Sequence, residues 1–191
     1  MSSKNDKFYL KLALNLAKQN EGLTNENPSV GCVIVKDNKI LSLSKTSISG
    51  RPHAEDNAIR FANTNDLKGS TIYVTLEPCT HHGKTPPCTD LIIKKKISKI
   101  VYASNYIDER TANKLKKVLK NHNISTKQIK MKEVTDFYKS YFFIRKNKFP
   151  YITAKLACSN DYYIYSKKNK NITNELSRKT SHLLRYKNNA I

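Results

Sequence analysis

Long hydrophobic runs are missing from this chain of 191 residues. No apolar stretch approaches the roughly 20 residues of a membrane-spanning helix, so we expect no membrane partner. The first residues, Met1 to Tyr9, are polar and contain no apolar signal-peptide core. Cysteine is also scarce, and four cysteines do not make a disulfide framework here. These absences predict a cytoplasmic protein.

Acidic residues are few, because 15 Asp and Glu stand against 35 Lys and Arg and leave a formal net charge of +20. Such an excess is typical of nucleic-acid-binding proteins when it gathers on one surface. Here lysine is spread through every segment together with asparagine, which favours a bias of composition over a dedicated nucleic-acid surface. A positive field would also attract a phosphorylated small substrate, so charge alone does not separate these partners.

The hydrophobic fraction of 38% is sufficient for a packed core, and the length suits one full domain and part of another. Hydrophobic periodicity predicts helices that alternate with short β-branched strands. This alternation favours a sheet covered by helices on both faces. The expected helices span 6–19, the segment after His53, 89–96, 112–120 and 133–145, and the expected strands span 30–35, 40–43, 71–76, 97–103 and 124–131.

One stretch carries the chemistry of a metal site. His53, Cys79 and Cys88 supply one imidazole and two thiols, the ligand types that bind Zn²⁺. Three protein ligands leave a fourth position for water, as in catalytic zinc sites. Glu55 follows His53 by two residues and is placed to move a proton between that water and a leaving group. The pattern H-x-E followed by Pro-Cys is typical of zinc nucleobase deaminases.

Eight residues separate Cys79 from Cys88, whereas the general deaminase pattern has two. The loop from Glu77 to Cys88 reads EPCTHHGKTPPC, and a second motif, NPSVGCV, begins at Asn27. Both motifs closely resemble the deaminase domain of the bifunctional riboflavin-biosynthesis deaminase/reductase. The resemblance covers roughly the whole chain and is sharpest in these two motifs.

The resemblance implies a cytidine-deaminase-like fold, a three-layer α/β/α sandwich around a five-stranded mixed sheet. It also implies hydrolytic deamination of 2,5-diamino-6-ribosylamino-4(3H)-pyrimidinone 5′-phosphate, with one Zn²⁺ per chain and Glu55 as the catalytic acid and base. The residues that match the family's substrate contacts are Asn27, His81 and Lys84. From its residue type alone, Asn27 fits equally well as the cap of a turn.

Two departures from the family pattern fall on the substrate side. Thr46 stands where the family commonly has a second histidine, seven residues before His53. After the fourth strand the family has an Asp-Pro turn followed by Gly-rich sequence, and here Asn105 to Arg110 contains neither Pro nor Gly. These changes leave the zinc ligands intact and bear on substrate affinity or identity.

Residues 149–157 resemble the first strand of the family's reductase domain, and 173–186 resemble its first helix. We therefore expect a deaminase domain over 1–146 and the incomplete start of a reductase-like domain over 147–191. A nucleotide-binding reductase fold needs on the order of 100 residues or more, so NADPH is not an expected cofactor. A homo-oligomer or a separate reductase chain would both be compatible with this organisation.

Three other interpretations remain open from the sequence. A tRNA or other nucleobase deaminase would share the zinc and the glutamate, but normally uses the short Cys-x-x-Cys spacing. A catalytically impaired remnant of the bifunctional enzyme would explain Thr46 and the altered turn. A structural zinc site would need a fourth ligand from His81, His82 or His122.

Overall fold

The computed structural model describes residues 3–64, 66–106, 114–165, 167 and 171–188. The chain divides into two compact units, Met1–Lys148 and Phe149–Ile191. Among the described residues, the first unit contains the five-stranded sheet and its core, and the second contains one helix. In the part of the chain that the structure describes, no helix is long and apolar enough to cross a membrane.

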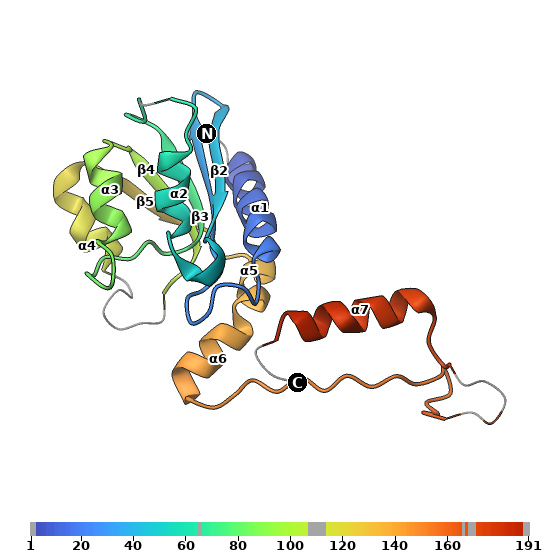
Figure 1. The fold of residues 1–191 in the computed structure, drawn as a ribbon. Helices are drawn as coiled ribbons and strands as arrows, with labels where there is room; N and C mark the ends of the chain where they lie inside the picture. The colour runs from blue at the N-terminus through green and yellow to red at the C-terminus, as the bar shows by residue number, and fades with distance from the viewer. Residues whose placement is uncertain (1–2, 65, 107–113, 166, 168–170, 189–191) are drawn as a thin grey trace. The chain divides into compact units, whose positions relative to one another are not determined.

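A five-stranded sheet with the order β2-β1-β3-β4-β5 forms the centre of the first unit (Figure 1). β1 runs antiparallel to both β2 and β3, whereas β3, β4 and β5 are parallel. The predicted mixed sheet is confirmed. Its strands are β1 (Gly31–Lys36), β2 (Lys39–Lys45), β3 (Thr71–Leu76), β4 (Lys99–Ser104) and β5 (Ser125–Gln128).

Helices cover the two faces of the sheet (Figure 1). α1 (Ser3–Gln19) packs on β1 and β3, while α2 (Ala54–Arg60) packs on β2 and β1 from the other face beside α3 (Cys88–Lys94). α4 (Leu115–Leu119) follows α3 on that face. The three-layer arrangement expected from the sequence is therefore present. Two short 3₁₀ helices, η1 (Ile48–Gly50) and η2 (Lys120–His122), also lie in the described part of the unit.

Gly31 lets α1 approach β1 closely. A Cβ atom at this position would lie 1.8 Å from the backbone oxygen of Ala13. Any side chain at position 31 would therefore push the helix off the strand that leads out of the Asn27 loop. This contact explains why the segment from Asn27 keeps a glycine where a β-branched residue would otherwise suit the strand.

The closing helix expected over 133–145 is two helices, α5 (Lys132–Phe137) and α6 (Lys139–Asn147). They are separated by Tyr138, which is buried and has non-helical backbone angles. Its hydroxyl donates to the carbonyl of Ser29 at 2.9 Å and lies 2.7 Å from Oγ1 of Thr75. The break in the helix at Tyr138 places this hydroxyl in the core, where Ser29 and Thr75 provide its hydrogen-bond partners.

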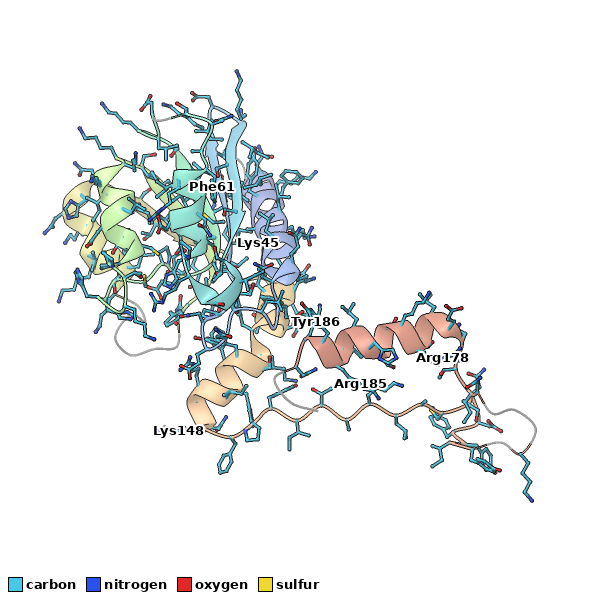
Figure 2. The ribbon with its side chains drawn as sticks, in the orientation of Figure 1. Lys45, Phe61, Lys148, Arg178, Arg185 and Tyr186 are labelled. Carbon is cyan, nitrogen blue, oxygen red and sulfur yellow. The ribbon has the colours of Figure 1, made fainter. Side chains whose placement is uncertain are left out.

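The second unit contains α7 (Glu175–Tyr186), which begins where the Asn174 side chain accepts a hydrogen bond from the backbone N–H of Ser177 at 2.8 Å. Arg178, Arg185 and Tyr186 lie along it (Figure 2). The strand expected over 149–157 is not formed, which corrects that prediction. A strand needs a neighbouring strand for its backbone hydrogen bonds, and the described residues of this unit provide none. Residues 107–113, part of the altered turn and of the helix expected over 112–120, lie outside the described residues.

Asp6 on α1 joins the helix to the sheet from a fully buried position. Its carboxylate accepts hydrogen bonds from the Tyr73 hydroxyl at 2.9 Å and from the Lys127 ammonium at 2.7 Å, and Lys99 lies 4.0 Å away. These partners come from β3, β5 and β4. Burial alone would raise the pKa of Asp6, but the hydrogen bonds and the two lysine charges outweigh it and lower the pKa below its ordinary value.

We expect Asp6→Asn to lower the free energy of unfolding by about 1–3 kcal/mol at pH 7, because it removes a charged hydrogen-bond acceptor from a buried network. Since the folded pKa lies below the unfolded value, Asp6 contributes its stability at pH values above about 4, and the contribution is lost as the pH falls through the folded pKa. Urea unfolding at several pH values checks this. If the free energy of unfolding differed between wild type and Asp6→Asn by the same amount at pH 7 and at pH 3, this prediction would be contradicted.

Candidate metal centre and substrate pocket

Three elements bring the predicted metal ligands together. His53 is the residue that precedes α2, and Cys88 is the first residue of α3. Cys79 follows the central strand β3, at its carboxyl end, by three residues. Ligands in α/β sheets commonly bind at the carboxyl ends of parallel strands, where helix N-termini converge. The local fold therefore places all three side chains at one edge of the sheet.

The three ligand atoms fit a single zinc ion. Nδ1 of His53 lies 3.8 Å from Sγ of Cys79 and 3.4 Å from Sγ of Cys88, and all three atoms lie within 4.8 Å of one another. A tetrahedral zinc with ordinary bond lengths requires N···S separations of about 3.6 Å. One imidazole and two thiols are also the donor set that zinc prefers. The distances between the ligand atoms and the types of ligand therefore both fit Zn²⁺.

The surroundings favour a thiolate at Cys79. Its sulfur accepts a hydrogen bond from the backbone N–H of Cys88 at 3.2 Å. Hydrogen bonds from the Cys88 thiol, the His53 ring and this N–H lower the pKa of Cys79 to about 4 despite burial. The same pair raises the pKa of Cys88, because the hydrogen bond to Cys79 and burial both favour its protonated form. The contact between the two sulfurs therefore favours the thiolate on Cys79 and the thiol on Cys88.

Glu55 lies in the first turn of α2 and is buried beside the ligands. Burial raises the pKa of its carboxyl to about 7, with the His53 charge acting against this increase. The structure places Glu55 where the sequence predicted it, close to the group that would hold the metal but not a member of it.

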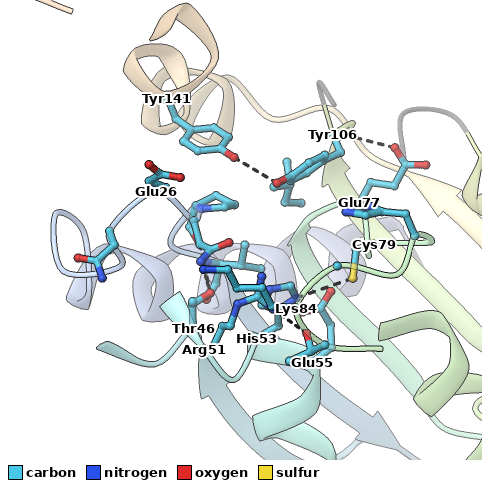
Figure 3. A pocket seen from close by; sticks show the side chains of 18 of the residues that line it. Glu26, Thr46, Arg51, His53, Glu55, Glu77, Cys79, Lys84, Tyr106 and Tyr141 are labelled. Atoms are coloured by element: carbon cyan, nitrogen blue, oxygen red, sulfur yellow. Dashed lines mark hydrogen bonds between the residues drawn. The ribbon is translucent and has the colours of Figure 1, made fainter. Parts of the chain in front are cut away.

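Two of the metal ligands, His53 and Cys79, line a large pocket of about 1310 Å³ (Figure 3). Asn27, His81 and Lys84, the three substrate contacts implied by the resemblance, all line it together with His53, Glu55 and Cys79. His82, to which the sequence assigned no role, lies instead 3.9 Å from the carboxylate of Asp90. All the predicted site residues except Cys88 therefore line one cavity.

Two contacts shape the loops that carry these side chains. Gly50 adopts φ +87°, and a Cβ atom there would lie 2.4 Å from Nδ2 of Asn27, so this glycine makes room for Asn27. Arg51 donates a hydrogen bond from its guanidinium to Oγ1 of Thr85 at 2.7 Å. This bond ties the segment before His53 to the loop that carries His81 and Lys84.

Several residues of the pocket were missed by sequence reasoning. The additional lining residues with polar side chains include Glu26, Arg51, Glu77, Tyr141, Arg145 and Lys146, whereas Tyr106 belongs to the altered segment that was expected on the substrate side. Glu77 belongs to the EPC motif and could have been found from it, because a buried carboxylate two residues before a metal cysteine is unusual at a strand end. The residues of α6 follow Cys88 by more than fifty positions and give no local signal.

No fourth protein ligand accompanies the triad among the residues that the structure describes. His81 lines the pocket, but neither it nor His82 or His122 belongs to the group that could hold the ion. The arrangement matches a zinc site with one open position and does not support a closed structural site.

Comparison with known proteins agrees with this geometry. Residues 3–104 match the family described as the cytidine and deoxycytidylate deaminase zinc-binding region. The chain is 41% identical over 147 residues to the diaminohydroxyphosphoribosylamino-pyrimidine deaminase of Buchnera aphidicola subsp. Acyrthosiphon pisum, and the match covers 76% of this chain and 99% of that protein. The chain belongs to this family of riboflavin-pathway pyrimidine deaminases.

Other relatives are longer. The riboflavin biosynthesis protein RibD of Aquifex aeolicus is 40% identical over 189 residues, which is 97% of this chain and 53% of that protein. The solved structure of RibD from Acinetobacter baumannii superposes with a TM-score of 0.83 at 33% identity, covering 96% of this chain and 52% of that one. The chain thus spans about half the length of these relatives. The cytidine-deaminase-like fold and the zinc triad His53, Cys79 and Cys88 are those of the family.

We expect Cys79→Ser to lower zinc affinity by at least about tenfold, because a hydroxyl is a poorer zinc ligand than a thiolate. Zinc content after dialysis and a chelator competition both measure this loss. Cys158→Ser is the matched control, since Cys158 is a free cysteine of the second unit and should leave zinc content unchanged. Equal zinc retention in the two variants would contradict the assigned ligand.

Proposed function

We propose that this chain catalyses the hydrolytic deamination of 2,5-diamino-6-ribosylamino-4(3H)-pyrimidinone 5′-phosphate, replacing the 2-amino group by oxygen and releasing ammonia. The observation that carries the proposal is the zinc triad with buried Glu55 beside it at one end of a cavity of about 1310 Å³. Two relatives, a riboflavin biosynthesis protein and a diaminohydroxyphosphoribosylamino-pyrimidine deaminase, bear names that refer to this pathway and to this kind of pyrimidine. Geometry and relatives thus point to the same reaction.

A zinc ion held by His53, Cys79 and Cys88 would lower the pKa of a water molecule and so supply a nucleophile at neutral pH. Glu55 accepts a proton from the attacking water oxygen as that oxygen bonds to ring carbon C2. Glu55 then donates the proton to the 2-amino nitrogen, and the C–N bond breaks to release ammonia. Its burial fixes the carboxyl beside the reacting atoms and keeps bulk water from competing for the proton.

The cavity suits a substrate larger than a free base. A nucleobase needs only a fraction of about 1310 Å³, whereas a ribosylamino phosphate extends well beyond the ring. Asn27 and His81 offer donors and acceptors for the edge of the pyrimidine or for the ribose, and Lys84 offers a positive charge for the phosphate.

Residues 147–191 correspond, in this proposal, to the start of the reductase domain of the longer relatives. The support is that the resemblance to those relatives continues through this segment, with 189 residues aligned.

We expect Glu55→Gln to retain zinc and to lower kcat by about 10²–10⁴, because the amide cannot take up the proton. Ammonia release from the pyrimidine substrate and zinc content measure the two quantities on the same sample. Asp56→Asn is the matched control: it changes the neighbouring carboxylate, which pairs with Arg60 at 2.6 Å outside the pocket. Undiminished turnover by Glu55→Gln would refute the role of Glu55.

A further inference from the structure

Helix α6 forms part of the pocket wall although the motifs of the family lie far from it in the sequence. Tyr141, Arg145 and Lys146 of α6 line the same cavity as His53 and Glu55. These three positions lie at i, i+4 and i+5 and therefore share one face of the helix. The neighbouring residue Phe142 packs against the core and fixes this orientation.

A pair of tyrosine hydroxyls joins α6 to the metal side of the pocket. The hydroxyls of Tyr106 and Tyr141 lie 3.1 Å apart and point toward each other (Figure 3), and both residues line the pocket. The backbone N–H of Tyr106 in turn donates to Oε2 of Glu77 at 3.3 Å. Glu77 precedes Cys79 by two residues, so this sequence of contacts runs from a metal ligand to α6.

A second connection joins α6 to the Asn27 side of the pocket. The guanidinium of Arg145 donates a hydrogen bond to the backbone oxygen of Glu26, the residue before Asn27. The same guanidinium lies over the ring of Tyr141, 5.5 Å from its centre. α6 is therefore held on two sides, and its polar face is fixed toward the cavity.

The side of the cavity formed by α6 and the loops is rich in positive charge. Four cationic side chains, Arg51, Lys84, Arg145 and Lys146, line the pocket, and among the described residues none of them forms an ion pair with a carboxylate. Two of the pocket's three carboxylates, Glu55 and Glu77, are buried, and Glu26 is exposed. The cations therefore outnumber the exposed carboxylates, which suits a phosphate dianion.

We propose that α6 is the wall that binds the phosphate of the substrate, with Lys146 and Arg145 as its specificity-determining cations and the Tyr106–Tyr141 pair as the contact that positions it. This inference rests on the proposed deamination of a ribosylamino 5′-phosphate. It adds α6 to the substrate contacts implied by the motifs. It also gives a role to Tyr106, which stands in the segment where the chain departs from the family pattern.

The first test compares Lys146→Ala with Lys139→Ala in the full, zinc-loaded chain. Both remove one exposed charge from α6, but Lys139 does not line the pocket. We expect Lys146→Ala to raise KM for the phosphorylated substrate by about 3- to 30-fold and to leave KM for its dephosphorylated form within about twofold. Lys139→Ala should leave both unchanged. An equal change for the two substrates, or for the two variants, would overturn the proposal.

The second test uses Tyr106→Phe, Tyr141→Phe and the double variant, which remove hydroxyls and retain the rings. Each single change should raise KM for the phosphorylated substrate by about 2- to 10-fold with little effect on kcat. The double variant should be no worse than the more affected single variant, because both changes remove the same hydrogen bond. Tyr102→Phe, on β4 outside the pocket, is the control. Multiplying effects in the double variant would overturn the role of the pair.

Calorimetric titration with the deaminated 5′-phosphate product separates this inference from the proposed function. Wild-type chain that binds the product but releases no ammonia from the substrate would contradict the proposed reaction alone. Equal product affinities for wild type and Lys146→Ala would contradict the phosphate wall, whether or not ammonia is released. Weaker binding by Lys146→Ala, with zinc content unchanged, supports it.

Discussion

Zinc binding requires Nδ1 of His53 and the sulfurs of Cys79 and Cys88 to lie within a few ångströms of one another, and the fold of the first unit holds them there. Each ligand comes from a different element, and each element is fixed by the sheet: Cys79 by the central strand β3, His53 by α2 and Cys88 by α3. Loops alone would leave such a group loose, whereas strand and helix ends hold it to the tolerance that a tetrahedral ion demands. The backbone N–H of Cys88, donated to Cys79, shows how closely the two ends meet.

Much of this arrangement could be predicted from the sequence because its signals are local. The strand expected over 71–76 has the same bounds as β3, since a short apolar, β-branched run between Gly69 and Pro78 leaves little freedom. The spacing of His53 and Glu55 and the EPCTHHGKTPPC loop specify the ligands by residue type. The fold class followed from the alternation of helices and strands and from the resemblance carried by these motifs.

What could not be predicted depends on contacts between distant residues. Periodicity over 133–145 indicates one helix, and only the partners of the Tyr138 hydroxyl, Ser29 and Thr75, explain why the helix is broken there. The strand expected over 149–157 has the right residues for a strand but no neighbour to pair with among the described residues. The contribution of α6 to the pocket likewise depends on Tyr141 meeting Tyr106, thirty-five positions away. Propensity describes what a segment favours, and tertiary contacts decide what it becomes.

Thr46, one of the two departures noted in the sequence, is bonded to the backbone of the segment that follows Asn27. The resemblance implies a histidine at this position; Thr46 is buried instead, and its hydroxyl accepts a hydrogen bond from the backbone N–H of Val30 at 2.9 Å. The same hydroxyl lies 3.3 Å from the carbonyl oxygen of Pro28, so it is occupied in holding the segment that follows Asn27. A small hydroxyl engaged with the backbone cannot replace the reach or charge of an imidazole. In the proposed phosphate wall, Tyr141, Arg145 and Lys146 of α6 line the pocket and would add polar contacts to those proposed for Asn27, His81 and Lys84.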